Sequence, residues 1–193
     1  MQTAILSVYE KEGLVEFARG LSTLGWRLLA SGGTAKLLRE NYIAVTEVAE
    51  YTKSPEILGG RVKTLHPAIH GGLLARPTVK DHQELIDLGW DNIDLVVVNL
   101  YPFEATIARP NVSYADVIEN IDIGGVTLIR AAAKNHERVT LLCDPLDYEA
   151  TLAELRMGAV SAERRKLLAV KGFSCTAHYD SVIAEYLSNR KLR

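Results

Sequence analysis

Two cations stand two residues apart in the glycine-rich stretch Gly59-Gly60-Arg61-Val62-Lys63-Thr64-Leu65-His66-Pro67. In an extended segment, residues two apart point to the same side, so Arg61 and Lys63 would present both positive charges to one target. The glycines before them let the backbone approach a ligand closely. This stretch therefore favours the binding of an anionic small molecule.

A second stretch suited to an anion is Ser31-Gly32-Gly33-Thr34. It lies between a predicted strand over 27–30 and a predicted helix over 34–41, and backbone amides at a helix N-terminus with flanking hydroxyls form a phosphate cradle. Its glycine spacing is neither that of the P-loop nor that of the dinucleotide-binding fingerprint. A tight connection without a ligand is the alternative interpretation.

Polar residues also follow the apolar run over 95–98 and precede a later helix. Asn99 and Tyr101 come just after that run. Tyr101 could donate a hydrogen bond to a developing oxyanion, or it could bury its ring with a satisfied hydroxyl. Asp122 precedes Gly124-Gly125, where an N-cap carboxylate is the structural alternative to a catalytic acid.

The helix expected over 126–134 carries two cations on one face. Thr127, Arg130 and Lys134 follow one another at three- and four-residue spacings. A solvated face is one interpretation of this pattern. The three alanines between the cations favour close packing instead, and a partly desolvated lysine suits proton transfer.

Histidine and cysteine residues do not predict a metal site or a nucleophile. His66 and His70 are four residues apart, but Pro67 makes a helix begin between them, and the H-E-x-x-H arrangement is missing. Capping or structural histidines are expected, and no G-x-S-x-G elbow occurs. Cys143 and Cys175 stand in apolar surroundings, so we expect inert buried thiols in a reducing compartment.

The elements that must position these residues alternate between strands and helices. Strands are expected over 3–8, 27–30, 44–48, 95–98 and 139–143, and helices over 14–24, 34–41, 78–88, 126–134 and 161–187, with others opening at 113 and 145. Such alternation predicts an α/β fold with right-handed crossovers and a parallel sheet. Ligands bind at the carboxyl ends of such strands, where Ser7, Ser31, Asn99 and the irregular segment 51–76 would meet.

Composition limits the classes of function. A chain of 193 residues is expected to form one domain over 1–193, and it can bury a sizeable core. A net charge of −2 disfavours a nucleic-acid partner held by electrostatics. The N-terminus does not look like a signal peptide, and no apolar run is long enough to span a bilayer, so a cytoplasmic protein is expected.

Taken in order, five stretches closely resemble the IMP cyclohydrolase family, the N-terminal domain of bifunctional purine-biosynthesis proteins whose other half is an AICAR transformylase. They are Ala30-Ser31-Gly32-Gly33-Thr34-Ala35, the 59–67 stretch, Asn99-Leu100-Tyr101-Pro102-Phe103, Ile121-Asp122-Ile123-Gly124-Gly125 and Arg130-Ala131-Ala132-Ala133-Lys134-Asn135-His136. The resemblance covers essentially the whole chain. It implies a methylglyoxal-synthase-like fold, a three-layer arrangement with a mainly parallel sheet between helices. It also implies a homodimer and no metal or organic cofactor.

The resemblance further implies the reaction and its residues. The family closes the second purine ring, converting 5-formamidoimidazole-4-carboxamide ribotide (FAICAR) to inosine 5′-monophosphate (IMP) and water, the last step of de novo purine biosynthesis. Asp122 is then expected to hold the carboxamide nitrogen, while Lys63, Tyr101 and Lys134 surround the formyl oxygen, with Lys134 as proton donor and acceptor. The expected substrate-binding set is Ser7, Tyr9, Lys11, Ser31, Gly32, Gly33, Thr34, Arg61, Lys63, Thr64, Val98, Asn99, Asp122 and Ile123.

Two departures and two alternatives accompany this resemblance. Tyr9 stands where the family commonly has serine, so any contact there is expected from the backbone. The chain stops at Arg193, so this chain is not expected to carry out formyl transfer, and a separate AICAR transformylase is one candidate partner. A non-catalytic nucleotide-sensing module of the same fold is the main alternative, because a sensor needs the phosphate cradle alone. A methylglyoxal synthase is the other, although the 61–67 run is not its pattern.

Overall fold

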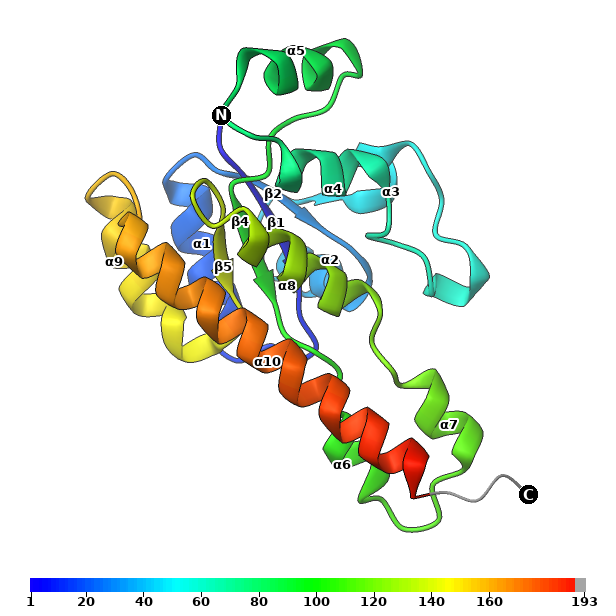
Figure 1. The fold of residues 1–193 in the computed structure, drawn as a ribbon. Helices are drawn as coiled ribbons and strands as arrows, with labels where there is room; N and C mark the ends of the chain where they lie inside the picture. The colour runs from blue at the N-terminus through cyan, green and yellow to red at the C-terminus, as the bar shows by residue number, and fades with distance from the viewer. Residues whose placement is uncertain (190–193) are drawn as a thin grey trace.

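Five parallel strands form the centre of the computed structural model, which describes residues 1–189. Their order across the sheet is β3-β2-β1-β4-β5, and Figure 1 labels β2, β1, β4 and β5 within it. The strands are β1 (Thr3–Ser7), β2 (Arg27–Ala30), β3 (Thr46–Glu47), β4 (Leu95–Val98) and β5 (Thr140–Leu142). The α/β prediction is confirmed, and every strand pair is parallel. The third strand is shorter than expected, with two residues in the ladder.

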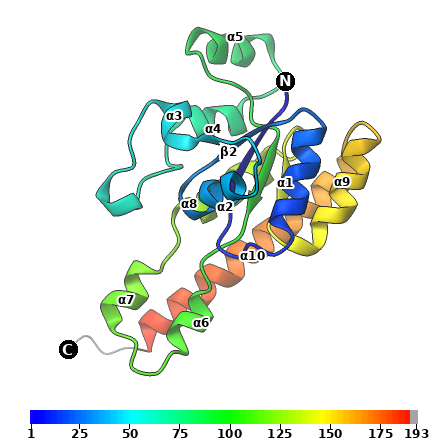
Figure 2. The ribbon, with the colours of Figure 1, turned by 180° about the vertical axis from the view of Figure 1, so that it is seen from behind.

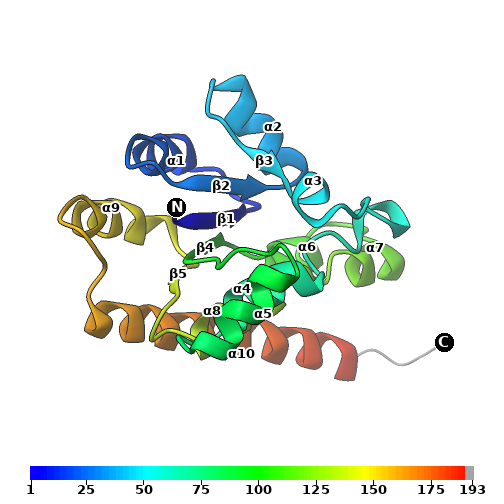
Figure 3. The same cartoon turned by 90° about the horizontal axis from the view of Figure 1, so that it is seen from above.

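Helices cover both faces of this sheet, which explains the unbroken apolar strands. Ala4 and Leu6 of β1 face one side, and Ile5 between them faces the other. The first side packs against α1 (Leu14–Thr23), α2 (Gly32–Glu40) and α9 (Tyr148–Arg156). The second side packs against α4 (Pro67–Leu74), α8 (Gly124–Lys134) and α10 (Ala162–Ser188). Figure 3 shows the three layers from above.

The long helix α10 joins the sheet to a small lobe. Gly172 does not interrupt it; this glycine lets α10 lie directly on β5, because a Cβ there would collide with the Leu141 side chain. Past the sheet, α10 meets α6 (Phe103–Ile107) and approaches α7 (Tyr114–Glu119) (Figures 1 and 2). Phe103, Val117 and Tyr179 are the buried centre of this lobe.

The segment that the sequence left irregular contains short helices. It includes α3 (Val48–Thr52), the 3-10 turn η1 (Leu58–Gly60) and α4; α5 (Val79–Asp87) follows it. His66 caps α4, with its Nδ1 accepting from the Ala68 N–H at 3.1 Å, and Pro67 takes the first helical position. The capping prediction for His66 is therefore confirmed.

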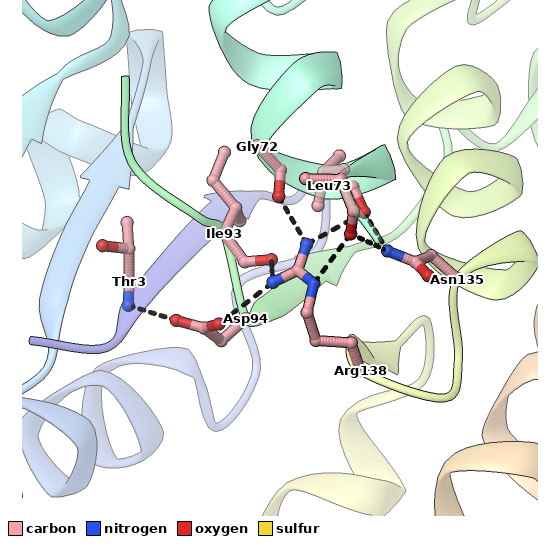
Figure 4. A network of polar contacts seen from close by, with 8 residues as sticks. Thr3, Gly72, Leu73, Ile93, Asp94, Asn135 and Arg138 are labelled. Carbon is pink, nitrogen blue, oxygen red and sulfur yellow. Dashed lines mark hydrogen bonds and ion pairs between the residues drawn. The ribbon is translucent and has the colours of Figure 1, made fainter. Parts of the chain in front are cut away.

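At the amino edge of the sheet, Arg138 joins three elements through one buried guanidinium. It donates to the carbonyls of Gly72, Leu73, Ala75 and Ile93, and it pairs with Asp94 at 3.1 Å. Asp94 in turn accepts from the Thr3 N–H at 3.0 Å. Figure 4 shows how this network ties α4 to the starts of β1 and β4.

Cys143 follows β5 and meets Cys175 on α10. Both are half-buried, and their thiols lie within hydrogen-bonding reach of each other. The hydrogen bond donated by the Cys143 thiol lowers the pKa of Cys175 to about 7, assisted by the nearby charges of His178 and Lys171. The same contact, together with burial, raises the pKa of Cys143. The two thiols are thus half-buried rather than fully buried, and the Cys175 thiol is the more acidic of the pair.

Candidate active site

A cavity of about 380 Å³ opens at the carboxyl edge of the sheet. Loops after β1, β2 and β4, the 59–65 segment and the start of α8 form its walls. Its lining residues are Ser7, Val8, Tyr9, Lys11, Ser31, Gly32, Gly33, Thr34, Gly59, Gly60, Arg61, Lys63, Thr64, Leu65, Asn99, Tyr101, Glu119, Ile121, Asp122, Ile123, Gly124 and Gly125. The convergence expected at this edge is thus present.

The first turn of α2 forms one wall. Ser31 precedes the helix in an extended conformation, and Gly32 has φ of +53°, which side chains rarely adopt. The amides that open a helix have no intrahelical acceptor, so they can face an anion. A Cβ on Gly32 would lie 3.3 Å from Nζ of Lys63, which places the ammonium beside these amides.

Three polar side chains near the end of β1 hydrogen-bond to the backbone of the loop that follows this strand. The Asn99 Oδ1 accepts from the N–H groups of Tyr9 and Glu10 at 2.6 and 3.0 Å. The Thr34 hydroxyl donates to the Val8 carbonyl at 3.2 Å. Lys11 Nζ donates to the carbonyls of Val8 and Tyr9, and burial lowers the pKa of Lys11. These contacts fix three loops around the cavity.

Arg61 and Lys63 both line the cavity, but the segment carrying them is not extended as expected. Gly59 and Gly60 turn the chain sharply with φ of +65° and +88°. Arg61 then takes a helical conformation. Arg61 pairs with Glu119 at 3.5 Å, and Lys63 pairs with Glu56 at 3.4 Å. Both contacts are at least partly open to solvent, where such ion pairs are weak and an anion can replace them.

Asp122 is the more buried of the two acids that line the cavity, the other being Glu119. Its Oδ1 accepts from the Gly125 N–H at 2.7 Å, and its Oδ2 accepts from the Tyr101 N–H at 3.4 Å. Burial raises the pKa of Asp122, and these two hydrogen bonds lower it by less. The carboxylate therefore bonds the first turn of α8 from the residue before its N-cap, Ile123, and it also lines the cavity.

Tyr101 stands beside Asp122 with its ring against Tyr9. The ring centroids are 5.0 Å apart, and Tyr101 is 47% exposed. Its hydroxyl is therefore not sequestered in the core, which disfavours the interpretation that it serves packing alone. Tyr9 lines the cavity as well.

Two expected site residues are not in the cavity wall. Val98 is the last residue of β4, is 1% exposed and belongs to the core on the α8 side of the sheet. Lys134 is exposed at the last residue of α8, while Asp122 precedes its first. An 11-residue helix is about 15 Å long, so one chain does not bring these two side chains together. The expectation that Lys134 shares a pocket with Asp122 is wrong within a single chain.

Several lining residues were not predicted as site residues. Gly59, Gly60, Gly124 and Gly125 stand inside recognised stretches, so the glycine pairs themselves were the signal. Glu119 belongs to α7 and faces Arg61, which no local pattern indicated. Among residues 1–189, no three His, Cys, Asp or Glu side chains gather as metal ligands do. None of the helices in that range has the length and apolar character needed to cross a bilayer.

Comparison with known proteins places these features in a family. Residues 13–127 match the MGS-like domain family, and residues 132–193 match the AICARFT/IMPCHase bienzyme family. The crystal structure of ForH superposes with a TM-score of 0.87 at 41% identity, covering 95% of this chain and 97% of ForH.

Two curated relatives are both named bifunctional purine biosynthesis protein PurH. The one from Thermosynechococcus vestitus is 59% identical over 95% of this chain, and the one from Bacillus cereus is 52% identical over 97%. The chain spans 36% and 37% of their respective lengths. The chain therefore belongs to the MGS-like domain family and is related to the AICARFT/IMPCHase bienzymes of purine biosynthesis.

Proposed function

We propose that this chain is an IMP cyclohydrolase that closes FAICAR to IMP. The carboxamide nitrogen attacks the formyl carbon, and a carbon–nitrogen bond forms. The carboxamide nitrogen gives up one hydrogen and the formamide nitrogen another, and the formyl oxygen leaves with both as water. The chain's similarity to a region of the PurH proteins supports this proposal.

The nucleotide phosphate is assigned to the wall formed by α2 and the 59–65 turn. The free amides of Gly32 and Gly33, with the charge of Lys63 beside them, suit a dianion. Arg61 would exchange its exposed contact with Glu119 for the phosphate. Binding energy gained here orients the reacting end of the substrate, which is how remote contacts accelerate a ring closure.

The reacting end is assigned to the wall that carries Asp122 and Tyr101. An amide nitrogen is a poor nucleophile, so the site must accept its proton and stabilise negative charge on the formyl oxygen. A carboxylate whose pKa burial raises is a better base than an exposed one, and Asp122 meets that condition. Lys63 and Tyr101 line the same cavity and can donate to the oxygen.

The observation that supports the proposal is that one cavity is lined by Asp122, by Gly32 and Gly33 at the start of α2, and by Lys63 and Tyr101. The test is incubation of the protein with FAICAR while the absorbance of the product purine is followed. Turnover well above the spontaneous rate is expected. Asp122→Asn should abolish most of it, while Asp87→Asn on the exposed face of α5 should not.

A sensor without catalysis would give a different result. It would bind IMP with the same cradle, yet the purine would appear only at the spontaneous rate in the unsubstituted protein. That outcome would overturn the proposed activity and leave nucleotide sensing as the function of the cavity. Equal turnover in Asp122→Asn and the unsubstituted protein would overturn the assigned role of the acid.

A further inference from the structure

The loop that carries Asp122 is hydrogen-bonded by a side chain that does not line the cavity. Tyr179 of α10 is 57 residues away in sequence, and its hydroxyl oxygen accepts from the backbone N–H of Asp122 at 2.8 Å. The same hydroxyl points its hydrogen toward the Asn120 carbonyl at 3.5 Å. One side-chain group thus contacts the backbone on both sides of Ile121.

The ring of Tyr179 is fixed by the lobe. Tyr179 is 8% exposed, and Phe103 of α6 meets it edge to face with 6.1 Å between ring centroids. Val117 of α7 belongs to the same buried cluster. Because α10 also packs on β5 through Gly172, the hydroxyl is held relative to the sheet as well as to the lobe.

Asp122 needs such a support. Residues 120–123 connect α7 to α8 without regular structure, and the carboxylate faces the cavity from this connection. The side-chain oxygens are aligned by the N–H groups of Gly125 and Tyr101. Those bonds fix the carboxylate only if the Asp122 backbone itself stays in place, and the Tyr179 hydroxyl holds that backbone.

We propose that Tyr179 is a positioning residue for the ring closure, acting through the backbone of Asp122. It does not touch the substrate, since it lies outside the cavity wall. Its hydroxyl fixes where the carboxylate meets the attacking nitrogen. This inference rests on the proposed function, although its structural half can be tested without turnover. Burial raises the pKa of Tyr179, which keeps its hydroxyl protonated as the contact to Asn120 requires.

The test is Tyr179→Phe, which removes the hydroxyl and keeps the ring. A misplacement of about 1 Å can cost about 10²-fold in rate, so kcat is expected to fall by about 10–100-fold. IMP affinity should stay within a few-fold, because the phosphate cradle belongs to other loops. Tyr148→Phe is the matched control, since it removes a hydroxyl from a buried tyrosine that stacks on Phe17 away from the cavity.

A second variant separates positioning from folding. Phe103→Leu loosens the packing of the lobe but keeps the Tyr179 hydroxyl, so it should lower the unfolding temperature clearly and change kcat little. Tyr179→Phe should lower kcat clearly and change the unfolding temperature little. If both variants lose kcat only in proportion to the folded fraction, Tyr179 has a structural role and the inference is overturned.

The amide resonance of Asp122 in a ¹⁵N-labelled sample gives a readout that needs no substrate. Tyr179→Phe is expected to shift this resonance and speed its hydrogen exchange, while Tyr148→Phe leaves both unchanged. An unchanged Asp122 resonance in Tyr179→Phe would overturn the inference. Failure of the unsubstituted protein to form IMP would overturn the proposed function instead, with the resonance still reporting on the contact.

Discussion

Asp122 accepts a 2.7 Å hydrogen bond from the backbone N–H of Gly125, three residues later in the first turn of α8. A Cβ at position 125 would lie 2.6 Å from the other carboxylate oxygen, so a larger residue there would have to displace the Asp122 side chain. The helix start favours a negative charge, whereas burial of the carboxyl group disfavours it. Burial is the larger effect, and the pKa of Asp122 is raised.

Asp122→Asn is expected to stabilise the protein at neutral pH while it removes activity. A carboxyl group whose folded-state pKa is raised contributes its full stability below its unfolded pKa. That contribution is lost as the pH rises through the folded-state pKa. The neutral amide avoids this loss and can keep the bond from Gly125.

Urea unfolding of both proteins over a pH series measures this effect. The advantage of Asp122→Asn should be largest at neutral pH and should shrink as the pH falls toward the unfolded pKa of aspartate. Asp87→Asn, on an exposed helix face, should show no such trend. If the extra stability of Asp122→Asn instead grew as the pH fell, the conclusion that burial raises the pKa of Asp122 would be contradicted.

Lys134→Ala tests whether the site is complete within one chain. Because Lys134 lies exposed at the far end of α8, this variant is expected to change turnover only a few-fold. Lys63→Ala removes a cation from the cavity and should lower turnover by about 10²–10³-fold. Steady-state kinetics on the two variants compare them directly.

A collapse of turnover in Lys134→Ala, with the fold intact by circular dichroism, would indicate that this side chain enters the cavity of a second copy. Mixing Lys134→Ala chains with Asp122→Asn chains would then restore activity, since one mixed site would carry both native residues. No recovery on mixing would contradict this assignment.

Arg138→Met is expected to lower the free energy of unfolding by about 3–5 kcal/mol, because it leaves buried carbonyls and Asp94 without their partner. Arg39→Met removes a more exposed ion pair with Glu47 and should cost about 0.2–1 kcal/mol. Urea titrations compare the two variants. Similar losses would mean that the network at the amino edge is no stronger than a surface pair.

Mild oxidation is expected to join Cys143 to Cys175. At neutral pH a fraction of Cys175 is thiolate, and the neighbouring Cys143 sulfur is within its reach. Diamide would accept both thiol hydrogens, and thiol titration of the unfolded protein would then find neither cysteine free. Cys175→Ser should leave Cys143 titratable. Two free thiols after oxidation of the unsubstituted protein would contradict this prediction.

Strands and caps were predictable because their causes are local. The apolar run over 95–98 forms β4, and Ser161 caps α10 by accepting from the Arg164 N–H as its residue type suggests. Gly172 lies inside the helix expected over 161–187, and a glycine in a helix pattern looks the same whether it breaks the helix or admits a neighbour. Only the packing on Leu141 distinguishes these cases.

The candidate site was predictable where stretches of sequence carry their own geometry. Ser31 and Gly32 open α2 as the strand–turn–helix pattern indicates. The three- and four-residue spacings placed Lys134 on a helix face but said nothing of the distance along that helix, which separates it from Asp122. Tyr179 reaches Asp122 only because α10 crosses from β5 to the lobe, and no local pattern records that path.

Because α10 runs from the sheet to the lobe, phosphate binding and the positioning of the acid depend on two different stretches of the chain. In the proposed function, loops near the N-terminus would bind the phosphate, whereas the acid would be positioned by a tyrosine from the last helix. Lesions in that helix should therefore yield proteins that capture the nucleotide normally and fail to dehydrate it. Affinity alone would be a poor measure of whether such proteins are intact.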